Sequence, residues 1–269
     1  MRILFLGDVV GRSGRTAIAE RLPKLRERWR LDFVVVNAEN ASNGAGCTAA
    51  HAQALLNAGA DVLTLGDHAF DQKDMLQAVE SDPRIIRPLN IAKAAPGVGV
   101  RAFQVGNRKV VVAQALGQVF MKNPYADPFS ALDGALRVHR LGAMADVVIV
   151  DLHAEATSEK VAMGHFLDGR ASLVVGTHTH VPTGDAMILP NGTAYLTDAG
   201  MCGDYRGVIG MTKDEPLRRF VTGLPKGRFE PGGEEATLSG VYVETGAGGR
   251  ATRVIPVREG PVLAPSGPD

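Results

Sequence analysis

Short runs of β-branched residues alternate with helix-like segments through the first third of this chain, and that alternation limits the possible folds. The predicted strands cover residues 2–6, 33–36 and 62–65. The predicted helices, with apolar residues at three- and four-residue spacing, cover 14–30, 48–58 and 72–80. A strand–helix–strand order places the strands parallel in one sheet, joined by right-handed crossovers. The sequence therefore predicts an α/β fold.

The remainder of the chain predicts additional strands, some of them antiparallel. Residues 99–105 and 109–116 flank a Gly–Asn turn, which favours a hairpin. A closing hairpin is predicted from 238–244 and 251–257, and further elements are predicted as strands at 147–150, 173–175, 187–189 and 194–196 and as helices at 132–142 and 158–167. No internal repeat or low-complexity linker marks a boundary, so we expect one domain over residues 1–260 with a mixed, two-sheet core. The Pro- and Gly-rich residues 261–269 predict a flexible C-terminal tail.

The charge balance argues against one broad class of function. The 269 residues include 29 Lys and Arg and 29 Asp and Glu, so the formal net charge is zero. General nucleic-acid binding depends on basic side chains that neutralise phosphates, and we therefore expect no general nucleic-acid-binding surface. Two cysteines cannot form a disulfide framework, and no apolar stretch approaches the roughly 18 residues of a membrane span. We expect a soluble, cytoplasmic protein without a membrane partner.

Clusters of polar residues follow five of the predicted strands. They are Gly7–Asp8, Asn37–Ala38–Glu39–Asn40, Gly66–Asp67–His68, Asp151–Leu152–His153 and Gly176–Thr177–His178–Thr179–His180. Ligands of open α/β sheets bind beyond the carboxyl ends of the strands, so the five clusters are expected to converge on one edge. Carboxylates and imidazoles suit Mn, Fe, Zn and similar ions, and alternation along an extended segment puts His178 and His180 on one side. The sequence thus predicts a metal site with enough ligands for two ions.

Each cluster taken alone also has a structural interpretation. Asp8 stands where a helix N-cap is common, and the Asn37–Asn40 segment could form a turn before the glycines. Asp67 could cap the helix that follows, and a single His153 is more often a hydrogen-bonded core histidine than a ligand. The metal site is favoured because five such coincidences would have to occur at the same place in the topology.

The order and local context of these clusters resemble the calcineurin-like metallophosphoesterases and, within them, the YmdB-like branch. The matching strings are GDVVGRSGR, NAENASNGAG, GDHAFDQKD, DLHAEATSEK, GTHTHVPTGD and LTDAGMCGDYRGVIGM, spanning about residues 2–213. The resemblance implies a four-layer α-β-β-α sandwich, with two sheets flanked by helices and a dinuclear site at the strand ends. It also implies phosphodiesterase activity, with 2′,3′-cyclic nucleotides as the substrates of this branch.

The resemblance also implies a role for individual residues. One metal would be held by Asp8, Glu39, Asn40 and His180. The other would be held by Glu39, Asp67, His153 and His178, with Glu39 bridging the two ions. His68 would lie next to the metals and act as the proton donor. The cofactors expected are two divalent ions per chain, Fe or Mn first, with Zn and Mg as alternatives.

Two positions depart from the pattern of the wider superfamily. That superfamily begins with D-x-H, whereas here Val10 follows Asp8–Val9, and Asn40 resembles the replacement ligand of the branch. The usual third motif is G-N-H, whereas this chain has Asp67 in place of the Asn. The additional negative charge is expected to tighten metal binding and to make a bound hydroxide less acidic.

The chemistry implied by these roles is hydrolysis of a cyclic phosphodiester. Two cations can polarise a phosphoryl oxygen and hold a bridging hydroxide that attacks phosphorus in line, while His68 protonates the leaving alkoxide. A diester carries a single charge, so the site needs no large basic patch. The alternatives are a phosphomonoesterase or nucleotidase on the same fold and a non-catalytic nucleotide-binding regulatory protein. We expect a small phosphodiester, a cyclic nucleotide, as the partner and a homo-oligomer as the assembly.

Overall fold

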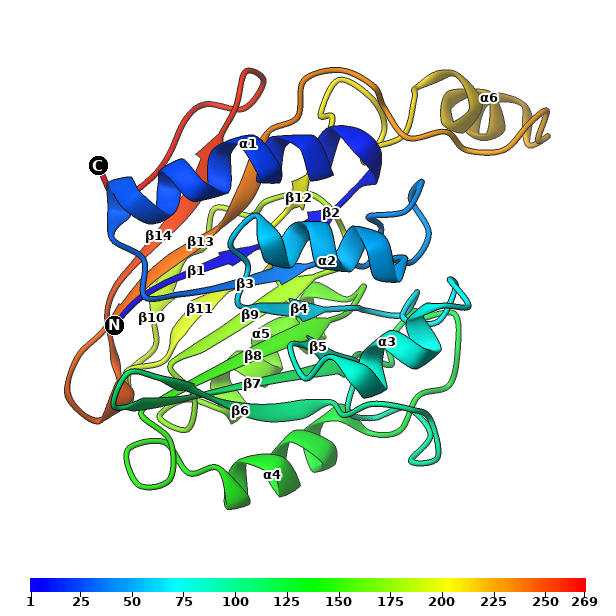
Figure 1. The fold of residues 1–269 in the computed structure, drawn as a ribbon. Helices are drawn as coiled ribbons and strands as arrows, with labels where there is room; N and C mark the ends of the chain where they lie inside the picture. The colour runs from blue at the N-terminus through cyan, green and yellow to red at the C-terminus, as the bar shows by residue number, and fades with distance from the viewer.

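Two six-stranded sheets lie face to face in the computed structural model, which describes all 269 residues (Figure 1). The first sheet has the order β14-β13-β1-β3-β4-β5, formed by β1 (Arg2–Leu6), β3 (Phe33–Asn37), β4 (Val62–Thr64), β5 (Ile85–Ile86), β13 (Leu238–Thr245) and β14 (Ala251–Glu259). The second has the order β10-β11-β9-β8-β7-β6, formed by β6 (Val100–Val105), β7 (Arg108–Leu116), β8 (Val147–His153), β9 (Leu173–Thr177), β10 (Met187–Ile188) and β11 (Ala194–Leu196). A short parallel pair joins β2 (Asp8–Val9) to β12 (Met201–Cys202).

Each sheet has a parallel centre and antiparallel margins. In the first sheet β1, β3, β4 and β5 are parallel, and β13 and β14 add an antiparallel pair beside β1. In the second sheet β7, β8, β9 and β11 are parallel, and β6 and β10 are the antiparallel edge strands. Because parallel strands share a direction, the polar segments that follow them leave each sheet at one edge.

Helices cover the outer face of each sheet, which completes the expected α-β-β-α sandwich (Figure 1). The first sheet is covered by α1 (Gly11–Trp29), α2 (Ala49–Asn57) and α3 (Met75–Ser81), and the second by α4 (Pro128–Val138) and α5 (Thr157–Phe166). Side chains alternate along β1, so that Leu4 and Leu6 pack toward the helices while Ile3 and Phe5 pack between the sheets. The four-layer architecture is therefore confirmed.

The strands that carry the polar clusters are longer than the sequence predicts. β8 continues to His153 instead of ending at residue 150, and β9 continues to Thr177 instead of residue 175. The polar side chains of Asp151 and Thr177 are hydrogen-bonded to each other inside the core, so they do not end the strands. Metal-ligand candidates consequently lie on the ends of rigid strands as well as on loops.

The helix expected at residues 132–142 begins four residues earlier, as α4. The Asp127 side chain accepts hydrogen bonds from the backbone amides of Phe129 and Ser130, at 2.9 and 3.2 Å. Pro128 occupies the first turn, where its missing N–H costs no hydrogen bond. An N-cap followed by Pro therefore sets the start of α4, and the expected bounds were wrong by about one turn.

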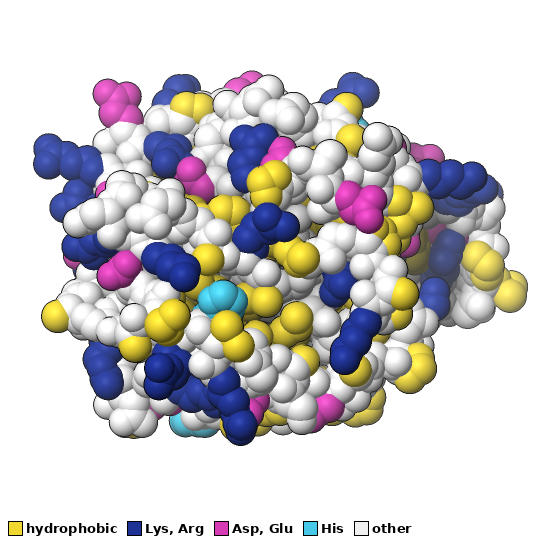
Figure 2. All heavy atoms as spheres, turned by 60° about the horizontal axis from the view of Figure 1, so that its bottom comes forward, with side chains coloured by type: hydrophobic (Ala, Val, Ile, Leu, Met, Phe, Trp, Pro, Cys, Tyr) yellow, Lys and Arg dark blue, Asp and Glu magenta, His cyan; other side chains and the backbone are white.

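The helix α6 (Asp214–Thr222) is not predicted by the sequence analysis and projects from the body of the molecule (Figure 1). Its apolar residues have little to pack against, and the Phe220 and Val221 side chains are 86% and 76% exposed. Figure 2 shows hydrophobic side chains on this projecting arm, and Lys and Arg side chains spread among hydrophobic and acidic ones on the adjoining face. The homo-oligomeric assembly expected from the sequence stays a prediction.

The end of the chain turns back against α1 and β14. The Trp29 indole N–H donates a hydrogen bond to the Asp269 carboxylate at 2.9 Å, and Ser266 forms a backbone bridge with Arg258. The Pro- and Gly-rich composition does not predict these contacts. The domain bounds and the flexibility of residues 261–269 stay predictions.

No helix here is both long enough and apolar enough to cross a membrane.

Candidate metal centre

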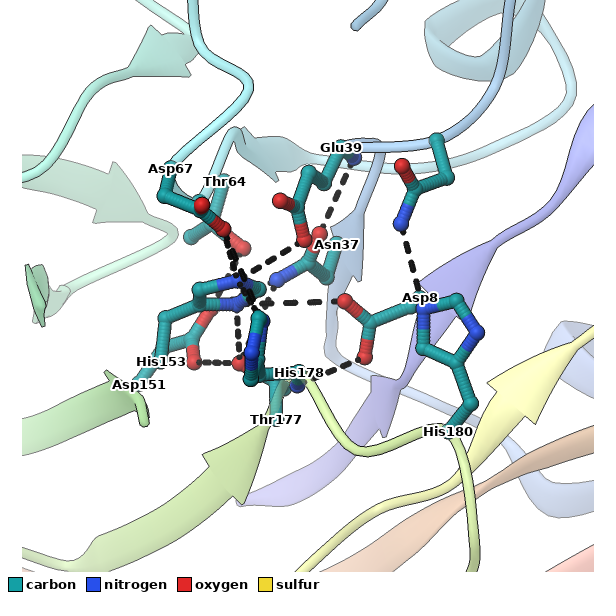
Figure 3. A network of polar contacts seen from close by, with 12 residues as sticks. Asp8, Asn37, Glu39, Thr64, Asp67, Asp151, His153, Thr177, His178 and His180 are labelled. Carbon is teal, nitrogen blue, oxygen red and sulfur yellow. Dashed lines mark hydrogen bonds and ion pairs between the residues drawn. The ribbon is translucent and has the colours of Figure 1, made fainter. Parts of the chain in front are cut away.

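Polar side chains from both sheets meet at the carboxyl ends of the parallel strands (Figure 3). Asp8 lies in β2 just after β1, Glu39 and Asn40 follow β3, Asp67 follows β4, His153 ends β8, and His178 and His180 follow β9. The structure therefore brings together all seven residues that the resemblance implies as metal ligands. The eighth expected site residue, His68, lies at the margin of this group.

Four of these side chains form a compact group that could hold a metal ion. One ligand atom from each of Glu39, Asp67, His153 and His178 lies within 4.8 Å of the other three. The His153 Nε2 atom lies 2.9 Å from Glu39 Oε2 and 3.0 Å from Asp67 Oδ1. It also lies 3.0 Å from the Nδ1 atom of His178. The group has the same members as the second ligand set implied by the resemblance.

The remaining candidates lie on the other side of Glu39. The Asp8 Oδ2 atom accepts a hydrogen bond from the His178 backbone N–H at 3.2 Å, and Asn40 Nδ2 lies 3.1 Å from His180 Nε2. The His180 Nδ1 atom lies 2.8 Å from the Ile209 carbonyl oxygen. Because a carbonyl only accepts, Nδ1 carries the proton and the lone pair of Nε2 faces the site.

Two buried carboxylate oxygens at this edge form no hydrogen bond of normal geometry, although one of them, Glu39 Oε2, has an ion-pair contact with His153 Nε2 at 2.9 Å. They are Asp8 Oδ1 and Glu39 Oε2, on side chains that are 0% and 1% exposed. Buried carboxylate oxygens are normally hydrogen-bonded, and a bound cation satisfies such an oxygen equally well. Gly66 leaves room for two of the candidate ligands, since a Cβ atom on it would lie 2.6 Å from Glu39 Cδ and 2.7 Å from His153 Cε1. The donor set and the orphaned oxygens therefore fit a divalent metal.

The ionisation of the group is perturbed by the crowding of acids and imidazoles. Burial is the largest influence on Glu39 and raises its pKa well above the usual value. Burial alone would lower the pKa of His153, but the neighbouring carboxylates, Glu39 foremost, outweigh it and raise this pKa well above its usual value. Burial would raise the pKa of Asp67, but hydrogen bonds with His153 and His178 lower it. Without a metal, a proton on His153 supplies the positive charge of the site.

His68 is placed differently from the seven ligand candidates. Its side chain is 40% exposed, and its Nε2 atom lies 4.0 Å from Glu39 Oε1. Its Nδ1 atom lies 2.6 Å from Asp71 Oδ2, three residues further along the chain. The imidazole therefore borders the metal group and solvent at once, with one nitrogen already held by a carboxylate.

The residues that orient the histidines are not among those predicted from the sequence. Asp71 holds His68, and Glu155 Oε2 lies 3.3 Å from the His178 Nε2 atom. The sequence did offer a signal for both carboxylates. Asp71 follows His68 by three residues, and Glu155 follows His153 by two, although Glu155 contacts His178 instead. The Ile209 carbonyl, which fixes His180, has no signal in the sequence, since every residue carries a carbonyl.

Comparison with known proteins shows the family to which the chain belongs. A family described as YmdB-like protein matches residues 4–257. The chain belongs to the YmdB-like family. It is 42% identical to the 2′,3′-cyclic-nucleotide 2′-phosphodiesterase of Bacillus subtilis (strain 168), over 91% of each chain.

Solved structures of similar proteins agree with this assignment. A hypothetical protein from Thermus thermophilus superposes with a TM-score of 0.90 at 42% identity, over 97% of this chain and 99% of that one. A Mycoplasma pneumoniae phosphatase superposes with a TM-score of 0.89 at 35% identity, over 97% and 93%. A 5′-nucleotidase precursor, also from Thermus thermophilus and 12% identical, matches 99% of this chain and 54% of its own with a TM-score of 0.56. This last likeness concerns the fold alone.

The protonation of His153 predicts how metal affinity depends on pH. Its pKa is raised in the metal-free protein, so the imidazole is protonated at neutral pH and must lose a proton before Nε2 can bind a metal. We expect Mn²⁺ affinity to rise with pH between about pH 6 and pH 8, and binding to release protons. Calorimetric titration in two buffers with different ionisation enthalpies measures that release.

The His165→Ala variant, which changes an exposed histidine on α5, serves as the control and is expected to keep the wild-type pH dependence. Mn²⁺ binding that neither releases protons nor changes with pH would contradict the prediction.

Proposed function

We propose that this protein is a metal-dependent phosphodiesterase that hydrolyses 2′,3′-cyclic nucleotides. The observation that carries the proposal is the pair of orphaned buried oxygens on Asp8 and Glu39, surrounded by imidazoles at the edge of a metallophosphoesterase sandwich. The substrate class is suggested by the name of the B. subtilis relative, with which the chain shares 42% of residues over 91% of its length.

We propose two divalent ions per chain, with Glu39 as the shared ligand. The first ion would be held by Asp8, Glu39, Asn40 and His180, and the second by Glu39, Asp67, His153 and His178. Fe and Mn suit this mixture of carboxylate and imidazole, with Zn and Mg as alternatives. When bound, such a pair polarises a phosphoryl oxygen and supplies a hydroxide nucleophile at neutral pH.

His68 is proposed as the general acid. The Asp71 carboxylate accepts a hydrogen bond from the His68 Nδ1–H and so orients the ring, and a proton carried on Nε2 would be the one given to a leaving group. The exposed position of His68 allows it to recover a proton from water after each turnover. The distance of 4.0 Å between its Nε2 atom and Glu39 Oε1 supports a position at the border of the group that would hold the metals.

The bridging role of Glu39 predicts the most damaging single ligand change. We expect Glu39→Gln to lose more cyclic-nucleotide hydrolysis than any other ligand variant, and more than the 10–100-fold typical of residues that only support ligands. Turnover is measured with Mn²⁺ and a 2′,3′-cyclic nucleotide.

Asp67→Asn is the matched control, because it makes the same change from carboxylate to amide at a residue that would touch one ion. It also restores the residue usual in the superfamily, so it should retain more activity. Near-normal turnover by Glu39→Gln would overturn the bridging assignment.

The general-acid role of His68 predicts a loss that depends on the leaving group. His68→Ala should keep its metal content and its fold, and should lose about 10²–10⁴-fold in the hydrolysis of an ester whose leaving group is a ribose alkoxide. The loss should be mild for a p-nitrophenyl diester, since p-nitrophenolate departs without a proton.

Asp71→Asn, which keeps the shape of the residue that holds His68, should show the same dependence on the leaving group to a smaller degree. Metal content is measured beside both substrates. Equal losses with the two substrates, or a missing metal in His68→Ala, would instead make His68 a ligand or a structural residue.

A further inference from the structure

Asp151 is a buried carboxylate that has no role in the proposed function, and it lies next to the group formed by Glu39, Asp67, His153 and His178 (Figure 3). Asp151, on β8, is 0% exposed. Its Oδ1 atom accepts a hydrogen bond from Thr177 Oγ1 at 2.7 Å. Its Oδ2 atom accepts from Thr64 Oγ1 and Gln114 Nε2, both at 2.7 Å, and from Asn37 Nδ2 at 3.2 Å. These donors come from β3, β4, β7 and β9, so Asp151 ties the two sheets together.

The direction of the amide contacts is fixed by the backbone. The Asn37 Oδ1 atom accepts from the Glu39 N–H at 3.0 Å, and Gln114 Oε1 accepts from the Leu65 and Gly66 N–H groups at 3.0 and 3.1 Å. Each amide therefore turns its NH₂ group, which can only donate, toward Asp151. The carboxylate acts as an acceptor in every one of these contacts.

The contact with Thr177 continues to a candidate metal ligand. The Thr177 Oγ1 atom lies 2.9 Å from His153 Nδ1. Because the single hydroxyl proton of Thr177 goes to Asp151, Oγ1 accepts from the His153 Nδ1–H. The proton on Nδ1 leaves the lone pair of Nε2 directed at Glu39 and Asp67, where the cation would lie.

The side-chain amides of Asn37 and Gln114 connect Asp151 to the backbone near two other candidate ligands, Glu39 and Asp67. Asn37 holds the backbone N–H of Glu39, and Gln114 holds the two N–H groups immediately before Asp67. Asp8, Asn40 and His180 have no hydrogen bond to Asp151 or to its four donors. One buried carboxylate is thus linked through Thr177 to the side chain of His153, and through the two amides to the backbone of Glu39 and to the backbone just before Asp67.

We propose that Asp151 is a positioning residue for the metal site formed by Glu39, Asp67, His153 and His178, and that it acts on His153 through Thr177. The inference rests on the proposed dinuclear function. An imidazole whose second nitrogen donates toward a carboxylate is held in one tautomer and is a stronger ligand. Loss of the link to His153 should therefore weaken one metal site and leave the other unchanged, whereas a purely structural Asp151 would affect neither selectively.

Two threonines allow a matched test of this inference. Thr177 and Thr64 are both 0% exposed and both donate to Asp151 at 2.7 Å, but only Thr177 also contacts His153. Thr177→Val and Thr64→Val each remove one such hydroxyl from the core. The metal-stripped full-length proteins are titrated with Mn²⁺ by calorimetry, and thermal unfolding is recorded for each variant.

We expect Thr177→Val to weaken one of the two Mn²⁺ binding events by about 10–100-fold, the other keeping its wild-type affinity. Thr64→Val should keep both wild-type affinities even where it lowers the unfolding temperature, and Thr177→Ser should restore binding because it retains the hydroxyl. Equal metal affinities in Thr177→Val and Thr64→Val would overturn the inference. Wild-type protein that binds fewer than two Mn²⁺ ions would instead overturn the proposed function, and this inference with it.

A measurement on the wild-type protein keeps the test independent of how the variants fold. Nitrogen-15 NMR of the Zn²⁺-loaded protein, labelled at histidine, is expected to show His153 with metal on Nε2 and a slowly exchanging proton on Nδ1. A metal on Nδ1, or the absence of that proton, would overturn the role of Thr177.

Discussion

Buried carboxylates that face one another repel, and this molecule gathers such groups at one edge of its sandwich. Asp8 and Glu39 are almost fully buried, and each has an oxygen that forms no hydrogen bond of normal geometry. The raised pKa of His153 has the same origin, because the surrounding acids favour a positive charge among them. The arrangement is stable when that charge is present, and a divalent metal supplies it more completely than a proton does. The need for positive charge among these buried carboxylates explains why the site would bind a metal, why its metal affinity would depend on pH, and why activity would require the metal.

The sandwich holds these groups in place against their repulsion. The candidate ligands come from both sheets, and the contacts of Asp151 with donors on β3, β4, β7 and β9 join the sheets next to them. Gly66 shows how closely these side chains approach the backbone, since any side chain there would overlap Glu39 and His153. Support from rigid strands keeps the geometry of a site constant, which metal catalysis requires.

The sequence predicts the parts of this protein that depend on repeating patterns. Strand and helix alternation indicates the α/β class, and polar clusters after strands such as those ending near Asp8 and Asp67 indicate where a site forms. The start of α4 was wrong because the Asp127–Pro128 cap outweighs the apolar spacing. α6 was missed because it packs little of its surface against the rest of the molecule, and its apolar residues such as Phe220 are exposed. The roles of Thr177 and Gln114 could not be predicted, because their partners lie on strands far away in the sequence.

The number of metal ions in the site can be measured directly, without assuming a substrate or a mechanism. X-ray diffraction from crystals of the Mn²⁺-loaded protein, collected on both sides of the manganese absorption edge, locates each ion by its anomalous signal. We expect two anomalous peaks, both within bonding distance of Glu39, one also beside Asp8 and His180 and the other beside Asp67 and His153. A single peak, or two peaks of which only one contacts Glu39, would contradict this expectation.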